Sequence, residues 1–217
     1  MTSRLGVLGG TFDPIHYGHL DAAAAARDAL SLDEVLFVPA HDQPLRTSDP
    51  AASGFHRFAM VSLAINGCHG YRVSDVELLR EGMSYTIDTL RHLHAEGWSP
   101  SQIFFILGAD AVAEIAHWRG FPEILDAARF VAVARPGVTL DAAVARTPAL
   151  RSRVSLVEAR TRDVSSTAIR QRLAAGESID ALVPAAVSRH ILAHHLYGAA
   201  DDLHGEDEHT RSQDPPR

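Results

Sequence analysis

Short apolar segments alternate with longer segments of helical periodicity from residue 5 to residue 157. The apolar segments are rich in β-branched and aromatic residues, which favours strands buried on both faces, as in a parallel sheet covered by helices. Six strands are expected, at residues 5–8, 35–38, 71–76, 103–107, 130–134 and 154–157. Between them the pattern predicts five helices, at residues 18–30, 55–65, 86–96, 111–118 and 140–144.

The alternation of strands and helices predicts an α/β fold with a doubly wound parallel sheet and right-handed crossovers. After residue 157 the pattern changes to two helices, at residues 165–175 and 184–197. Gly176 after the first and Pro184 at the start of the second are common helix-boundary signals. Residues 1–198 are therefore expected to form one domain, followed at residues 199–217 by an acidic tail that we expect to be disordered.

Composition excludes several classes of protein. The net charge of −7 argues against a general nucleic-acid binder, because affinity for a polyanion comes from clustered basic side chains. The single cysteine, Cys68, excludes an internal disulfide framework and fits a reducing compartment. No segment approaches the ~20 continuous apolar residues that a membrane helix needs, and no secretion signal is recognisable. We therefore expect a cytoplasmic protein that binds neither nucleic acid nor membrane.

Candidate chemistry begins where the first expected strand ends. Gly9 and Gly10 allow the backbone to approach a phosphate closely, and the next helix presents free amide groups and its positive dipole end to an anion. His16 and His19 stand at the start of that helix, with Gly18 between them. Two imidazoles on one side of an anion can donate hydrogen bonds to phosphate oxygens and stabilise the charge of a transition state.

Two other interpretations of this histidine pair are open at this point. A zinc ion would need a third protein ligand, and the sequence offers no partner at ligand spacing. A chain with 13 histidines can also carry such a pair by chance, but His194, His195 and His204 have no comparable context. The glycines favour a phosphate site without a metal held by the protein.

The segment GGTFDP at residues 9–14, followed by HYGH at residues 16–19, resembles the nucleotidyltransferase superfamily with the HxGH signature. That superfamily has a Rossmann-like fold and transfers an adenylyl or cytidylyl group to a phosphorylated metabolite. The resemblance implies that Thr11, His16 and His19 contact the phosphates of ATP and take part in catalysis. It also implies that Gly9 and Gly10 lie against the nucleotide.

A second segment, VSSTAIR at residues 164–170, puts hydroxyl groups at a helix start and an arginine one turn inside. The guanidinium there provides a fixed positive charge and bidentate donors for a phosphate, although Ser and Thr are also ordinary N-caps. The segment is similar to the ISSTxIR signature of the same superfamily, with Val164 in place of isoleucine. The resemblance implies that the β- and γ-phosphates of ATP are bound by Ser165, Ser166, Thr167 and Arg170, the last also in a catalytic role.

The middle of the chain resembles one branch of that superfamily, the bacterial nicotinate-nucleotide adenylyltransferases. Gly108 and Asp110 follow the fourth expected strand and match a nucleotide-binding segment, although Asp110 is also a suitable N-cap for the next helix. Tyr85 and Thr86 match a segment whose backbone amides receive the nicotinate carboxylate. Trp118 matches a tryptophan that stacks on nicotinate, although a tryptophan at helical spacing is more often a core residue.

Three further positions have counterparts in that family. Arg46, in the loop after the second expected strand, replaces a lysine that attracts phosphates, so charge is kept but the compact ammonium becomes a planar fork. His56 and Arg57 open the next helix. The resemblance implies a structural or phosphate-steering role for them, and an exposed helix charge is the simpler interpretation.

The resemblance implies transfer of AMP from ATP to nicotinate mononucleotide, which gives deamido-NAD and pyrophosphate in NAD biosynthesis. The acceptor phosphate is already anionic near neutral pH, so no general base is needed and Mg²⁺ carried by ATP is the only cofactor implied. The alternatives are a sister adenylyltransferase acting on nicotinamide mononucleotide or phosphopantetheine, an ATP-binding protein without catalysis, and a zinc protein. Thr86 and Trp118 argue against phosphopantetheine.

Overall fold

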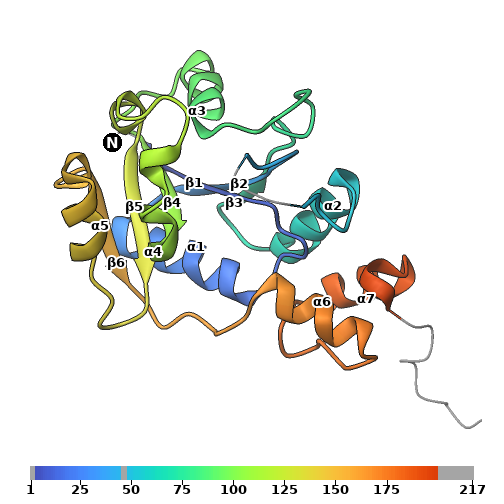
Figure 1. Ribbon diagram of the computed structural model, residues 1–217. Coiled ribbons are helices and arrows are strands. Elements are labelled where there is room, and N and C mark those ends of the chain that lie inside the picture. The colour runs from blue at the N-terminus through green and yellow to red at the C-terminus, as the bar shows by residue number, and fades with distance from the viewer. Residues whose placement is uncertain (1–2, 45–47, 200–217) are drawn as a thin grey trace, which may run out of the picture.

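The centre of the molecule is a six-stranded sheet, seen in a computed structural model that describes residues 3–44 and 48–199 (Figure 1). All strand pairs are parallel, in the order β3-β2-β1-β4-β5-β6. The predicted doubly wound α/β fold is therefore confirmed. The strands are β1 (Leu5–Gly10), β2 (Glu34–Pro39), β3 (Tyr71–Val73), β4 (Ile103–Gly108), β5 (Arg129–Ala134) and β6 (Val154–Glu158).

Helices cover both faces of this sheet (Figure 1). One face carries α1 (Tyr17–Leu30) and α2 (Gly54–Ile65), and the core on that side continues to α6 (Ser166–Ala174) and α7 (Ala185–Ala193). The other face carries α3 (Thr86–Ala95), α4 (Ala109–Val112) and α5 (Asp141–Arg146). Successive residues of one strand face opposite cores, as Phe104 and Phe105 do in β4. Strands buried on both faces have continuous apolar sequences, which is why they were recognisable.

The sheet contains a topological switch point between β1 and β4. The chain runs outward from β1 to β2 and β3, and then returns to the other side of β1 as β4. The connections that leave the ends of β1 and β4 therefore diverge, which opens a crevice at their carboxyl ends. The two segments that follow these strands are those in which the sequence analysis expected nucleotide contacts.

Two predicted elements in the middle of the chain differ from the structure. The strand expected at residues 71–76 is limited to Tyr71–Val73, where its pairing with β2 ends. The helix expected at residues 111–118 is divided into α4 and the 3₁₀ helix η1 (Ile115–His117). Its later backbone bonds span three residues, as from the N–H of His117 to the carbonyl of Glu114, which is the tighter 3₁₀ pattern.

The C-terminal helix is also shorter than predicted. It ends at Ala193 instead of residue 197, because His195 and Tyr197 have left-handed backbone angles, with φ of 49° and 63°. Ala199, expected to begin the tail, is only 8 % exposed and belongs to the core. Residues 200–217 lie outside the described part of the chain, so the tail stays a prediction. No helix of the described residues is long and apolar enough to cross a membrane.

Candidate active site

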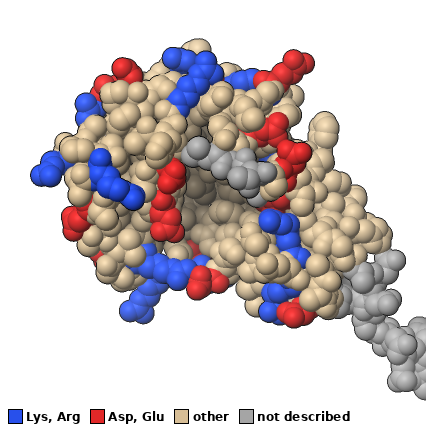
Figure 2. Space-filling model, in the orientation of Figure 1, with Lys and Arg blue, Asp and Glu red and all other residues tan. Residues whose placement is uncertain are grey.

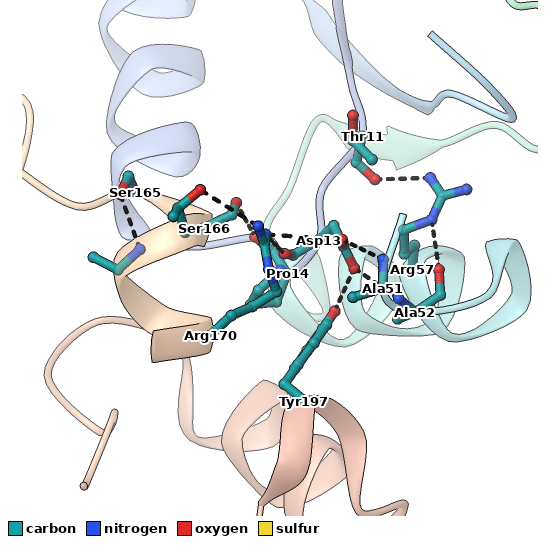
Figure 3. A network of polar contacts seen from close by, with 12 residues as sticks. Thr11, Asp13, Pro14, Ala51, Ala52, Arg57, Ser165, Ser166, Arg170 and Tyr197 are labelled. Atoms are coloured by element: carbon teal, nitrogen blue, oxygen red, sulfur yellow. Dashed lines mark hydrogen bonds and ion pairs between the residues drawn. The ribbon is translucent and has the colours of Figure 1, made fainter. Parts of the chain in front are cut away.

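The loop between β1 and α1, which carries the first signature, is held by the guanidinium of Arg57 (Figure 3). Arg57 is 2 % exposed and donates to the carbonyl oxygens of Thr11 at 2.8 Å, Ala40 at 2.6 Å and Ala52 at 3.1 Å. A buried charge is stable only when it is well hydrogen-bonded, and these carbonyls come from three different segments. The interpretation of Arg57 as an exposed helix charge is therefore wrong.

Asp13 is the second anchor of this loop, and its carboxylate is 2 % exposed. It accepts hydrogen bonds from the N–H groups of Ala51 at 2.8 Å and Ala52 at 3.0 Å and from the hydroxyl of Tyr197 at 2.9 Å. Its backbone carbonyl accepts from Nη1 of Arg170 at 2.7 Å. Segments from four parts of the chain thus meet at one residue (Figure 3). The sequence analysis missed Tyr197, because no local pattern marks a partner 184 positions away.

The histidine pair lies at the start of α1 with its rings stacked. The ring centroids of His16 and His19 are 3.7 Å apart, at an interplanar angle of 22°. The backbone N–H of His16 donates to Nδ1 of His19 at 3.3 Å. Because this Nδ1 is an acceptor, the proton of the neutral ring is on Nε2. The start of the helix therefore fixes the tautomer in which Nε2 of His19 can donate to a ligand.

Gly18 is required by the ring of His16. A Cβ atom at this position would lie 3.1 Å from Cε1 and Nδ1 of His16 and 3.3 Å from the carbonyl oxygen of Arg162. These separations are shorter than the optimum of about 3.5–4.0 Å for non-bonded carbon atoms. Any side chain at Gly18 would displace the ring of His16. This steric limit explains why the signature has a glycine at this position.

Both histidines of the pair are neutral near pH 7. Burial lowers the pKa of His16 to about 4, against a smaller opposing effect of Asp21. Burial, and then the proximity of His16, lowers the pKa of His19 well below its usual value. Nδ1 of His16 is buried without a hydrogen-bond partner among the described residues. Buried polar atoms are normally paired, so this atom is free to pair with a ligand.

The pair lines a cavity of about 820 Å³ at the carboxyl ends of β1, β4 and β5. The space-filling view shows the molecule hollowed in the middle of this side, with acidic and basic side chains at the rim (Figure 2). A Cβ atom at Gly108 would meet no atom within 4 Å, so the wall there is open to a ligand. The expected nucleotide-binding residues that line the cavity are Gly9, His16, His19, Gly108, Asp110, Ser165 and Ser166.

At the start of α6, the hydroxyl groups of Ser165 and Ser166 form hydrogen bonds with backbone groups of the protein. The hydroxyl of Ser165 accepts from the N–H of Ala168 at 3.1 Å, which confirms the ordinary N-cap interpretation for this residue. The hydroxyl of Ser166 donates to the carbonyl of Pro14 at 2.9 Å. Arg170 contacts Asp13 and, at 3.4 Å, the hydroxyl of Thr167. Neither Arg170 nor Thr167 lines the cavity. Gly10 and Thr11 do not line the cavity either, and the phosphate contacts expected of all the signature residues stay predictions.

Two arginines outside both signatures line the cavity, Arg135 and Arg162. Arg162 forms a bidentate ion pair with Asp21, at 2.8 and 3.0 Å, and lies over the ring of Tyr17. Arg135 pairs with Asp163 at 2.5 Å. The chain contains no lysine, so every permanent positive side-chain charge at this site is an arginine. No local pattern marks either arginine, because their partners Asp21 and Asp163 lie 141 and 28 positions away.

A second, smaller pocket of about 150 Å³ is lined by the residues expected to bind the acceptor, Tyr85, Thr86 and Trp118. Trp118 is half-buried and packs edge-on against Phe105 of β4, with ring centroids 5.9 Å apart. It is therefore both a core residue and a pocket wall. The ring of Phe105 also lies 3.5 Å from where a Cβ atom of Gly9 would be, so it lies between a wall residue of the pocket and one of the larger cavity.

The opposite wall of the small pocket is the loop after β2, at Gln43 and Pro44. Ser84 ties this loop to the segment before α3, because its N–H donates to the carbonyl of Asp42 at 2.7 Å and its hydroxyl accepts from the N–H of His41 at 2.9 Å. The two walls are thus pinned together. Arg46, expected in the same loop, lies outside the described residues.

The zinc alternative finds no third ligand at the first histidine pair. Within residues 3–44 and 48–199, no His, Cys, Asp or Glu joins His16 and His19 in a group with metal-ligand spacing. The group with that spacing is formed by His56, His190 and His194. The sequence around His194 gives no sign of this group, because its neighbours in space are not its neighbours in sequence.

The chain is similar to known proteins over most of its length. Residues 7–172 match the family model of cytidylyltransferase-like proteins. A probable nicotinate-nucleotide adenylyltransferase of Roseiflexus sp. (strain RS-1) is 47% identical over 198 residues, which cover 90% of this chain and 98% of that protein. A protein of the same description from Corynebacterium kroppenstedtii is 44% identical over 198 residues, covering 89% of this chain and 90% of that one.

Solved structures share the fold at lower sequence identity. Plasmodium falciparum nicotinic acid mononucleotide adenylyltransferase complexed with NaAD has a TM-score of 0.74 and 18% identity, over 93% of this chain and 100% of that chain. A putative nicotinate-nucleotide adenylyltransferase from Vibrio parahaemolyticus has a TM-score of 0.61 and 18% identity. With the match to the family model and relatives of over 40% identity along most of its length, the chain belongs to the cytidylyltransferase-like family and, within it, to the nicotinate-nucleotide adenylyltransferases.

Proposed function

We propose that this adenylyltransferase binds the triphosphate of ATP in the larger cavity and nicotinate mononucleotide in the pocket beside Trp118, and joins them to deamido-NAD with release of pyrophosphate. The observation that carries this proposal is the convergence of two helix starts. His16 and His19 of α1 and Ser165 and Ser166 of α6 line one cavity, and the two segments are hydrogen-bonded across 152 positions. Two converging helix N-termini supply free amide groups and positive dipole ends to an anion.

In the proposed reaction, an oxygen of the acceptor phosphate bonds to the α-phosphorus of ATP. The bond from the α-phosphorus to the oxygen that bridges it to the β-phosphorus breaks, and the electron pair of this bond leaves with pyrophosphate. No proton has to be removed from the acceptor phosphate, so catalysis consists of alignment and stabilisation of charge. Nε2 of His19 and the ring of His16 donate to the oxygens on which negative charge develops. As neutral rings, they do so without a change of protonation.

The donors of the cavity fit a magnesium ion that arrives with ATP. Asp110 is the only carboxylate among the described residues that line the cavity. Mg²⁺ at nucleotide sites is usually held by one or two carboxylates together with phosphate oxygens and water. When bound, the ion neutralises charge on the phosphates and fixes their orientation. In this proposal Arg135 and Arg162 add permanent positive charge on the same wall.

The smaller pocket suits an aromatic ring with a negative group. Trp118 offers a flat apolar face, and Thr86 begins α3, whose first amide groups are free to receive a carboxylate. The guanidinium of Arg119 lies over the ring of Tyr85, 4.7 Å from its centroid, and adds positive charge to this wall. We therefore propose that the acid is preferred to the amide. Arg46 is proposed to attract the acceptor phosphate in place of the family lysine.

The test is a pyrophosphate-release assay with ATP, Mg²⁺ and three acceptors: nicotinate mononucleotide, nicotinamide mononucleotide and phosphopantetheine. The expected result is highest kcat/KM with the acid, with deamido-NAD identified as the product by mass spectrometry. Faster turnover of the amide would overturn the acceptor assignment. No release of pyrophosphate with any of the three acceptors would overturn the proposal that the protein catalyses adenylyl transfer to them. A His19→Ala preparation, purified in parallel, controls for contaminating activity.

A further inference from the structure

Three histidines meet between α2 and α7, away from the cavity and pocket described above. His56 lies near the start of α2 and His190 lies in the last turn of α7. His194 is the first residue after the end of α7. One ring nitrogen from each residue lies within 4.8 Å of those of the other two. Nδ1 of His56 and Nε2 of His190 are only 3.1 Å apart. None of the three lines the proposed ATP cavity or acceptor pocket.

The backbone sets this convergence. His190 and His194 are four positions apart, which places them on the same face of a helix, one turn apart, and their ring centroids are 4.4 Å from each other. The third ring is brought in by packing between the two helices. Met60 and Val61 of α2 and Val187 and Ile191 of α7 are fully buried in one core cluster.

The chemistry of the group is that of a metal site. A neutral imidazole has one nitrogen with a free lone pair that can bind a metal ion. One ring nitrogen from each of the three histidines converges here, and Nδ1 of His56 and Nε2 of His190 are within hydrogen-bond distance of each other. The neutral ring is the form of histidine that binds metal. Three imidazoles are an established ligand set for zinc, with water in the fourth position.

We propose that His56, His190 and His194 bind one divalent transition-metal ion of the zinc type, which links α2 to α7. Zinc–nitrogen bonds of about 2.0–2.1 Å in a tetrahedron place ligand nitrogens about 3.4 Å apart. One pair of ring nitrogens is 3.1 Å apart and all three lie within 4.8 Å of one another, so small movements of the rings would bring them to this spacing. His194 is exposed, so its ring can move toward the other two without disturbing the core.

The proposed ion would act on the framework rather than on adenylyl transfer. Helix α7 leads within a few residues to Tyr197, whose hydroxyl binds Asp13 in the loop of the first signature. A cross-link between α2 and α7 would hold this C-terminal segment against the domain, because an ion that binds only the folded state raises its stability. We therefore expect metal to raise the unfolding temperature, with turnover at moderate temperature unchanged.

The experiment uses the full chain without an affinity tag, stripped with a chelator. Co²⁺ serves as a spectroscopic probe, with ligand-field bands in the visible region, and Zn²⁺ is then added in competition. The expected result is one Co²⁺ per chain, displaced by Zn²⁺, and a rise of several degrees in the midpoint of thermal unfolding with either ion. No saturable uptake of Co²⁺, or uptake without a change in unfolding, would overturn the proposal.

Variants assign the site. His190→Gln and the exposed His194→Gln should each weaken Co²⁺ binding on the order of tenfold or more, since even partners of metal ligands contribute that much. His195→Asn is the matched control, because it removes the neighbouring imidazole and asparagine tolerates the left-handed backbone there. Unchanged binding in both glutamine variants, or a loss in His195→Asn or His19→Ala instead, would place the metal elsewhere. Either result leaves the proposed adenylyl transfer untouched, because that reaction rests on other residues.

Discussion

The hydroxyl of Tyr197 donates a hydrogen bond to Oδ1 of Asp13 at 2.9 Å, although 184 positions separate the two residues. Burial raises the pKa of Tyr197 far above its usual value, and the carboxylate of Asp13 raises it further, so the phenol remains a donor at all physiological pH values. The contact joins the end of the described chain to the loop that carries the first signature. The C-terminal helices thus belong to the framework of the site.

Replacing Tyr197 with phenylalanine should lower the free energy of unfolding by about 1–3 kcal/mol, because it leaves a buried carboxylate short of one donor. Urea denaturation measures the change. Tyr17→Phe is the control, since the ring of Tyr17 makes its contact with Arg162 and is retained. We expect less than about 0.5 kcal/mol there. Equal losses in the two variants would show that the contact with Asp13 has no special weight.

The His19→Ala variant should lose about 10²-fold in kcat, because it removes one donor to the charge that develops on the phosphates. Far-UV circular dichroism should be unchanged. His92→Ala, which removes an exposed histidine paired with Glu96 on α3, is expected to retain full activity. Turnover of the His19 variant near that of the parent would remove this residue from the mechanism.

Two glycines of the site should respond differently to alanine. At Gly18 the new methyl group would press on the ring of His16, so we expect reduced turnover and none of the gain of about 1 kcal/mol usual for glycine to alanine in a helix. At Gly108 the methyl group would enter open space, so stability should be unchanged while the KM for ATP rises. Steady-state kinetics and thermal unfolding measure both. A Gly18→Ala variant more stable than the parent and fully active would contradict the steric argument.

Stability should fall as the pH is lowered from about 6.5 to 4. His16 in the unfolded chain takes up a proton near pH 6.5, whereas in the folded protein its pKa is about 4. The unfolded state then binds more protons in this window, so the free energy of unfolding decreases by roughly 3 kcal/mol for His16 at the limit. His19 acts in the same direction. Urea denaturation at several pH values should give a shallower slope for His16→Asn than for His92→Asn, and equal slopes would refute the assignment.

Substituting Trp118 with phenylalanine should raise the KM for nicotinate mononucleotide about three- to tenfold while the KM for ATP stays constant, because the smaller ring stacks less well and Trp118 does not line the larger cavity. Trp98→Phe is the matched control, since Trp98 packs in the core on the same face of the sheet but does not line the pocket. A change in the KM for ATP of similar size would mean that Trp118 acts through the fold.

Much of the fold followed from local pattern. The four central strands are largely buried, and strands buried on both faces are apolar throughout, so they were visible as short apolar runs. The alternation of strands with helices predicted the doubly wound sheet. The end of β1 and the start of α1 are joined by only a few residues, so spacing alone placed Gly9, His16 and His19 together. Helix ends were predicted less well, because the left-handed angles at His195 and Tyr197 have no signal in the sequence.

The contacts that hold the site came from packing. Arg57 was expected to be exposed and is buried, because its partners are carbonyl oxygens on other segments, and a carbonyl is present at every residue. The bond between Tyr197 and Asp13, and the meeting of His56 with His190 and His194, depend on how α2 and α7 pack around a shared core. Such packing is set by many weak apolar contacts acting together, so the identity of a single residue does not predict which polar groups the packing brings into contact.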